Sequence, residues 1–343
     1  MTDSEQSQQI ISSVPLTDAA DHAGDEYEVE AEIELRQLRV PLEFHAKRMD
    51  STLAFTLPEF SRSYLQQLIV AGLVQLNGSK VTKVSQAVKA FDQIDIELRP
   101  TPQSQAFKPE VMTLDVVFED EFLLVINKPA GLVVHPAPGN WSGTLLNGLL
   151  ARDPGAALLP RAGIVHRLDK DTSGLMVVAR KRPVMDELVR MIAARSVNRQ
   201  YIAVAHGAWA GPATRQVNLP VGRDPRNRLR MAVVDMERNP GKVASTDIAL
   251  LQGNADYSMV RCKLHTGRTH QIRVHMAALG HPLVADKLYG GQDAGGIQRQ
   301  ALHAFRLAFD HPVRGEAMEF RLPLPADLAA GLGVLGLRYN PVE

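Results

Sequence analysis

The sequence from residue 163 to residue 176 is Gly163-Ile164-Val165-His166-Arg167-Leu168-Asp169-Lys170-Asp171-Thr172-Ser173-Gly174-Leu175-Met176. A charged, turn-forming segment stands between two apolar runs, and loops at strand edges often present functional side chains. Two carboxylates, Asp169 and Asp171, lie among three possible cations. This composition fits a nucleophilic carboxylate paired with an arginine, and it also fits a structural knot of ion pairs. The residues alone leave both interpretations open.

Buried strands and an amphipathic helix are predicted around this segment. Nearly continuous apolar runs indicate strands that are covered on both faces. They occupy residues 121–127, 175–180 and 200–206. Between the last two runs, residues 183–195 carry their apolar side chains on one stripe, which predicts a helix. Residues 269–279 predict a further helix, in which Arg273 lies beside the apolar stripe at the boundary of the core.

Composition restricts the class of protein. With 343 residues, 45% of them apolar, the chain is long enough for two domains with sizeable cores. Its single cysteine, Cys262, excludes an internal disulfide and a cysteine-rich zinc site. No apolar stretch approaches about eighteen residues, and the polar, acidic N-terminal segment does not resemble a signal peptide. We therefore expect a soluble cytoplasmic protein without membrane contact.

The net charge of zero conceals an uneven distribution. Residues 1–35 hold ten acidic residues and no lysine or arginine, which leaves 38 basic against 28 acidic residues, about +10, for the remainder. Lys and Arg gain by displacing counterions from phosphates, so a basic body suggests a polyanionic partner, and a merely solvated basic surface is the equal alternative. We predict an acidic disordered tail over 1–37, a small domain over 38–104 and a larger one over 105–343, with a polar linker near 101–110.

The small domain is predicted to combine short helices and strands. One helix opens near Met49, and a second spans residues 61–69 with Ser61 as its N-cap. Residues 73–80 form a strand that runs into an Asn-Gly turn, and residues 91–98 form another strand. These features resemble the S4 RNA-binding domain, which presents basic side chains to RNA. The resemblance assigns RNA contacts to positions that could otherwise be solvated charges: Arg48, Arg62, Lys80, Lys83 and Lys89.

Blocks of the large domain resemble, in the same order, the motifs of the RluA/RluD family of pseudouridine synthases. The most specific is the ten-residue block from His166 to Leu175. Ser173 and Ala285 depart from the family's usual Thr and Gly, both away from the assigned chemistry. The resemblance spans about residues 38–340, and its other blocks are 127–136, 199–204, 266–275, 288–291 and 299–304.

The resemblance implies three catalytic residues. Asp169 matches the essential carboxylate of the family. Arg273 matches the arginine that pairs with it, and an adjacent guanidinium favours the ionised carboxylate. Tyr201 matches a tyrosine that packs against the target base. From spacing alone, Tyr201 would be an ordinary core tyrosine and Arg273 a surface charge on a helix.

Further arginines are candidate RNA contacts. The resemblance assigns Arg167 and Arg268 to RNA, although an ion pair between Arg167 and Asp171 is the alternative for the former. His166 and His270 are expected to be structural. Alternate arginines in one loop also suit phosphate contacts, or simply an exposed loop: Arg223, Arg226, Arg228 and Arg230.

The resemblance further implies a fold and a reaction. The fold is α+β: a catalytic domain with a mixed, largely antiparallel sheet and a central cleft, preceded by the S4-like domain. The reaction isomerises uridines of 23S large-subunit rRNA, in a hairpin loop at the subunit interface, and supports ribosome assembly. It needs no cofactor and no metal, because no atom is gained or lost. The partner is 23S rRNA or the large ribosomal subunit, and the enzyme is expected to be monomeric. A sibling with other rRNA targets and a binding-dominated assembly factor are the alternatives.

Overall fold

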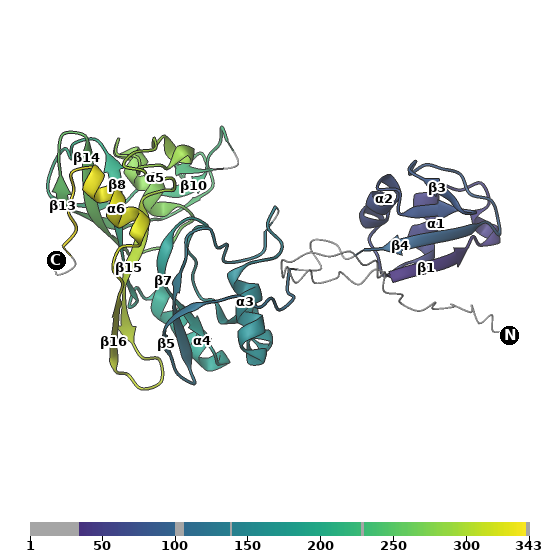
Figure 1. Cartoon of the computed structure of the whole chain (residues 1–343), viewed down its shortest axis with the longest axis horizontal. Helices are drawn as coiled ribbons and strands as arrows, with labels where there is room; N and C mark the ends of the chain where they lie inside the picture. Colours follow the sequence, from purple (N-terminus) through teal and green to yellow (C-terminus); the bar gives the residue numbers. More distant parts are fainter. Residues whose placement is uncertain (1–33, 100–105, 138, 228–229, 341–343) are drawn as a thin grey trace, which may run out of the picture. The chain divides into compact units, whose positions relative to one another are not determined.

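The described residues form two compact units, one before residue 100 and one from residue 106 onward (Figure 1). Most of the predicted acidic tail and half of the predicted linker lie outside the described residues. Among the residues that are described, no helix is long and apolar enough to cross a membrane. The computed structural model describes residues 34–99, 106–137, 139–227 and 230–340.

The N-terminal unit packs two helices on a four-stranded antiparallel sheet. As predicted, Ser61 caps the second helix by accepting a hydrogen bond from the Tyr64 N–H, and an Asn-Gly turn joins two strands. The first strand begins at Glu34, so the predicted tail boundary at residue 37 was wrong: residues 34–37 pair with the strand that ends the domain. The elements are α1 (Met49–Thr56), α2 (Arg62–Val70), and strands in the order β1 (Glu34–Arg39), β4 (Gln93–Leu98), β2 (Val74–Leu76) and β3 (Ser79–Val81).

A nine-stranded sheet organises the described part of the C-terminal unit. Every pairing in it is antiparallel except that of β7 with β15, so the predicted mixed, largely antiparallel α+β fold is confirmed. Along the sheet the strands are β5 (Asp115–Glu119), β6 (Leu123–Lys128), β7 (Ser173–Ala179), β15 (Leu302–Asp310), β8 (Asn198–His206), β14 (Tyr257–Leu264), β13 (Thr246–Gly253) and β9 (Thr214–Val217), and β16 (Ala317–Arg321) pairs with β15.

Helices cover both faces of this sheet, which explains the continuous apolar runs. Odd-numbered residues of β6 and β7 pack against α4 (Arg182–Ala193), and even-numbered residues pack on the opposite face against α3 (Leu145–Arg152). Farther along, alternate residues of β8 face α6 (Ala326–Val334) or α5 (Gln271–Ala278). The faces covered by α3 and α5 are continuous and form one core.

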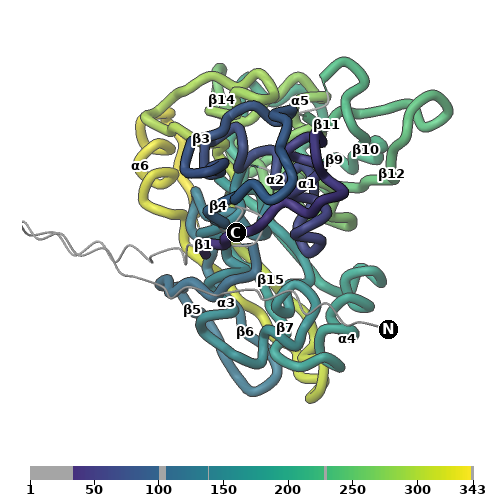
Figure 2. Tube along the Cα trace, turned by 90° about the vertical axis from the view of Figure 1, so that its right-hand side faces the viewer, coloured from purple at the N-terminus to yellow at the C-terminus, as the bar shows by residue number. Residues whose placement is uncertain are grey.

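Different helices pack on the two halves of the sheet (Figures 1 and 2). One half carries β5, β6 and β7 with α3 and α4. The other carries β13 and β14 with α5, beside a small sheet of β10 (Val221–Arg223), β11 (Met231–Val233) and β12 (Gly241–Lys242). The segment between residues 164 and 172 enters β7 at the middle of the sheet, on the face that α3 and α5 share.

Candidate active site

Backbone hydrogen bonds fix the segment that carries Asp169. The Thr172 N–H donates to the Asp169 carbonyl at 3.1 Å, which closes a turn immediately before β7. The neighbouring carbonyl of Lys170 accepts from the Gly131 N–H at 3.0 Å. At the start of β7, Gly174 has φ 118°, and a Cβ there would lie 2.2 Å from the Ala304 carbonyl oxygen. Only glycine allows β7 and β15 to approach so closely at this point.

A fully buried lysine, Lys128, binds the backbone of the same segment. The Lys128 ammonium donates to the carbonyls of Pro129 at 2.7 Å and of Leu132 and Lys170 at 2.9 Å. Burial lowers the pKa of Lys128 to about 8, and the negative charges of Asp171 and Asp169 oppose that fall. Three carbonyl acceptors are the partners that a buried ammonium requires, so Lys128 fixes the backbone next to Asp169.

Arg273 joins two carboxylates. Its Nη1 donates to Asp169 Oδ2 at 3.2 Å, while Nε and Nη2 donate to the two oxygens of Asp286 at 2.7 Å. The side chains of Arg273 and Asp286 are 8% and 1% exposed, so their bidentate pair is shielded from water, whereas Asp169 retains 15% exposure. Burial alone would lower the pKa of Arg273, but Asp286 and Asp169 outweigh it and keep the guanidinium charged. The predicted pairing of Asp169 with Arg273 is confirmed.

Aromatic and imidazole groups complete the support of Arg273. The guanidinium carbon lies 4.9 Å from the centroid of the Tyr289 ring, and the Tyr289 hydroxyl is 2.7 Å from His270 Nδ1. His270 adopts a left-handed conformation, φ 56°, directly before α5, and its Nε2 lies 3.9 Å from Asp169 Oδ2. Burial lowers the pKa of His270, so the ring is neutral at neutral pH. Asp169 therefore faces one guanidinium and one neutral imidazole.

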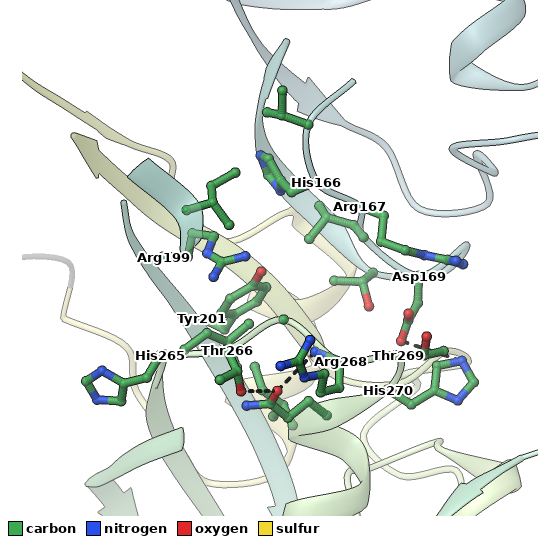
Figure 3. Close-up of a pocket in the computed structure, with 18 of the residues that line it drawn as sticks. His166, Arg167, Asp169, Arg199, Tyr201, His265, Thr266, Arg268, Thr269 and His270 are labelled. Atoms are coloured by element: carbon green, nitrogen blue, oxygen red, sulfur yellow. Dashed lines mark hydrogen bonds and ion pairs between the residues drawn. The ribbon is translucent and has the colours of Figure 1, made fainter. Parts of the chain in front are cut away.

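Tyr201 enters the site from β8. Its side chain is on the face of the sheet that α5 covers, and it lines the same cavity as Arg273. Figure 3 shows Tyr201 and Asp169 at this cavity. Burial raises the pKa of Tyr201 to about 12, although the charge of Arg199 opposes the rise. The phenol is therefore neutral. The three residues predicted to be catalytic, far apart in the sequence, are brought together at one cavity.

The cavity is large and strongly cationic. It encloses about 770 Å³, within the range of natural ligand sites. Apolar side chains of Ile164, Leu264 and Leu302 form part of its wall. Among the described residues that line it, Asp169 is the only carboxylate, whereas six arginines are present: Arg161, Arg167, Arg195, Arg199, Arg268 and Arg273. This charge matches the polyanionic partner that the sequence indicates.

The two arginines predicted to contact RNA near Asp169 both line this cavity. Arg167 is exposed, and within the described part of the chain it forms no ion pair with Asp171 or any other carboxylate. The alternative of an Arg167–Asp171 pair was therefore wrong, because the segment presents the guanidinium to the cavity. Arg268 is partly buried, and its Nε donates to the Val243 carbonyl at 3.1 Å.

The other residues predicted to contact RNA differ in whether they form ion pairs and in how exposed they are. In the N-terminal unit, Arg48 and Arg62 both pair with the fully buried Asp50, at 2.9 and 2.8 Å, and remain half exposed. Burial opposes ionisation of Asp50, but hydrogen bonds from these arginines and from Gln66 hold its pKa well below its usual range. Lys80, Lys83 and Lys89 are exposed, as is Arg226, whose backbone N–H donates to Asp224; Arg228 lies outside the described residues.

Sequence reasoning missed several residues of the site. Asp286 holds Arg273, and Lys128 holds the Asp169 segment. Asp286 stands between Ala285 and Lys287, in a stretch with no functional pattern, and the matched block 127–136 assigned no role to Lys128. Arg199 could have been found, because it stands two residues before Tyr201 in a strand and must share its face. His166, expected to be structural, also lines the cavity.

The arrangement has a definite chemical capacity. The Asp169 carboxylate stands at the wall of a cavity beside an aromatic ring and aliphatic side chains, which suit the flat face of a nucleobase. The surrounding guanidinium groups suit phosphates. A nucleotide that leaves its stack could therefore place its base and sugar against Asp169.

Comparisons with known proteins agree with this geometry. Residues 122–278 match the RNA pseudouridylate synthase family, and residues 47–94 match the S4 domain. A ribosomal large subunit pseudouridine synthase D of Neisseria meningitidis serogroup B is 48% identical, over 88% of this chain and 82% of the relative. An uncharacterised RNA pseudouridine synthase of Bacillus subtilis is 43% identical, over 83% of this chain and 92% of the relative.

A solved structure shows the same catalytic fold. Human RNA pseudouridylate synthase domain containing 1 superposes with a TM-score of 0.50 and 29% identity, over 65% of this chain and 89% of the human chain. The extensive identity to the bacterial relatives, together with the match across the segment that carries Asp169, decides the family. The chain belongs to the RNA pseudouridine synthases and is an isomerase with an S4 domain ahead of its catalytic domain.

Proposed function

We propose that the chain converts specific uridines of 23S large-subunit rRNA to pseudouridine, with Asp169 as the catalytic carboxylate. The observation that carries this proposal is the placement of Asp169 against Arg273 in a cavity that Tyr201 and six arginines line. The target class is supported by relatives named ribosomal large subunit pseudouridine synthase D, at 41–48% identity. We further propose a hairpin loop at the subunit interface as the target and ribosome assembly as the process it supports.

The reaction assigns a task to each catalytic residue. The bond between ribose C1′ and uracil N1 breaks, the base turns, C5 bonds to C1′, and the proton on C5 leaves while N1 gains one. The Asp169 carboxylate engages the extruded nucleotide, and the hydrogen bond from Arg273 orients it. The Tyr201 ring packs on the uracil, a contact worth about 1–3 kcal/mol. Extrusion itself costs a few kcal/mol, which these contacts offset.

The remaining basic residues bind the RNA outside the reacting nucleotide. Arg167 and Arg268 contact the strand at the cavity. Arg48, Arg62, Lys80 and Lys83 present a basic surface on the S4 domain, and Arg226 does so on a loop of the catalytic domain. We assign Arg228, which lies outside the described residues, to RNA as well. The enzyme acts as a monomer in the cytoplasm, where it meets rRNA, and it needs no cofactor because substrate and product are isomers.

Mapping pseudouridines in rRNA tests the proposal. We expect a strain that lacks the chain to lose specific pseudouridines of the large-subunit rRNA, and wild-type protein, but not Asp169→Asn, to restore them. Loss of pseudouridines only at other positions of the large-subunit rRNA would contradict the interface loop as the target. An unchanged pattern would contradict the proposed function. If Asp169→Asn restored ribosome assembly without any pseudouridine, binding would be the main role.

A further inference from the structure

A buried arginine without a counterion lies in the cavity wall. Arg199 is only 6% exposed, and the cavity is open to its side chain. Within the described residues its guanidinium forms no ion pair and no hydrogen bond, and its Nε is a buried donor without an acceptor. A buried guanidinium normally has a carboxylate or carbonyl partner, because an uncompensated charge costs several kcal/mol. The missing partner therefore points to a ligand.

A second unsatisfied donor lies next to it. His166 Nε2 accepts the Val177 N–H at 3.0 Å, so in the neutral ring the proton is on Nδ1. That Nδ1 is buried and has no partner among the described residues. Burial and then the charge of Arg199 lower the pKa of His166 to about 3, which keeps the ring neutral. Figure 3 shows Arg199 close to both His166 and Tyr201.

The position of this donor pair relates it to the substrate. Arg199 and Tyr201 point to the same side of β8, two residues apart, and Tyr201 is the proposed platform for the uracil. Gly267 leaves room around the guanidinium, since a Cβ at that position would lie 3.0 Å from Arg199 Nη1. The exposed Arg195, four residues earlier in the chain, also lines the cavity. Arg199 is therefore one of several cationic side chains in the cavity wall.

We propose that Arg199 and His166 together bind a phosphate oxygen of the RNA strand beside the target uridine. A phosphate supplies the negative charge that Arg199 lacks and can accept from its two-pronged guanidinium and from His166 Nδ1–H simultaneously. A uracil carbonyl would satisfy one donor and leave the buried charge uncompensated. This inference rests on RNA as the substrate of the proposed function, but not on which RNA is modified.

The test measures tritium release from RNA labelled with [5-³H]uridine, because C5 loses its hydrogen when it bonds to C1′. Total RNA from a strain that lacks the chain holds every natural substrate unmodified. The full chain is compared with Arg199→Met, Arg199→Lys and the control Arg182→Gln, which removes an exposed arginine at the far end of α4. KM, kcat and the salt dependence of kcat/KM are determined for each.

We expect Arg199→Met to raise KM about tenfold or more, with kcat nearly unchanged, because a charge-assisted contact to RNA is lost. The slope of log(kcat/KM) against log[salt] should become shallower by about 0.7–0.9, as for one lost phosphate contact. Arg199→Lys should keep the slope and show an intermediate KM, since it retains the charge but not the planar fork. Arg182→Gln should match the wild type.

Thermal unfolding without RNA separates binding from a structural role. Removal of an uncompensated buried charge should leave the Tm of Arg199→Met no lower than that of the wild type. A fall in kcat with unchanged KM and slope would indicate a contact to the base and overturn the proposal. A Tm lowered by more than about 4 °C with unchanged KM would assign Arg199 to the fold and also overturn it. Release from RNA other than large-subunit rRNA would refute the proposed function alone.

Discussion

Asp286→Asn removes the buried charge that holds Arg273 in place. The bidentate pair lies almost wholly out of water, with both contacts at 2.7 Å, and the carboxylate is 1% exposed. Breaking a buried pair by removing one partner costs about 3–5 kcal/mol. Because asparagine retains one acceptor, we expect a loss of about 2–3 kcal/mol in the free energy of unfolding. Arg273 then loses the charge opposite it and one of its two hydrogen bonds at position 286, so the 3.2 Å contact to Asp169 is less well oriented, and we expect kcat to fall about 100-fold.

Two measurements and one control check this expectation. Trp141 and Trp209 both lie in the catalytic unit, so tryptophan fluorescence in urea reports its unfolding. Tritium release reports the reaction. Asp293→Asn is the matched control, because its pair with Lys287 is at least half exposed and should contribute less than about 0.5 kcal/mol. If Asp286→Asn and Asp293→Asn had the same free energy of unfolding and the same kcat, the idea that the buried pair positions Arg273 would be refuted.

Two further predictions concern stability. Lys128→Met leaves the carbonyl oxygens of Pro129 and Leu132 without a donor, and that of Lys170 with only the Gly131 N–H. It should cost about 3–5 kcal/mol in urea unfolding, whereas the exposed Lys170→Met should cost about 0.5 kcal/mol or less. Equal stabilities would refute the role of Lys128. Burial lowers the pKa of His166 to about 3 and of His303 to about 4, against about 6.5 in the unfolded chain. Between about pH 6.5 and pH 4, only the unfolded chain binds protons at these two histidines. Each histidine therefore contributes stability that is complete above about pH 6.5. As the pH falls towards 4, this contribution decreases by up to about 1.4 kcal/mol per pH unit. His303→Gln should make the acid-side slope of unfolding free energy shallower, and an unchanged slope would contradict the assignment.

Local patterns predicted the elements but not their ends. Residues 175–180 were recognised as a buried strand, yet β7 begins at Ser173, because residues 173 and 174 pair with His303 and Ala304 far along the chain. The helix expected from residue 269 begins at Gln271, since His270 turns left-handed and the Gln271 side chain accepts the Arg268 N–H. Both ends depend on contacts that a local apolar pattern does not contain.

The site was predictable where the family resemblance named a residue. Asp169, Tyr201 and Arg273 came from matched motifs, and spacing alone would have assigned Tyr201 to the core and Arg273 to a surface. Asp286 was not found, because in sequence it precedes Lys287 as in any polar turn, and only the tertiary fold sets it against Arg273. Lys128 was not found because a lysine after a buried strand is usually exposed.

Tritium release by Asp169→Asn and Asp171→Asn tests the central claim most directly. Both substitutions remove one negative charge from the same segment, but only Asp169 lines the cavity and contacts Arg273. We predict that Asp169→Asn releases no tritium above background from large-subunit rRNA and that Asp171→Asn retains activity. Release by Asp169→Asn at the wild-type rate would show that this carboxylate does not carry out the reaction.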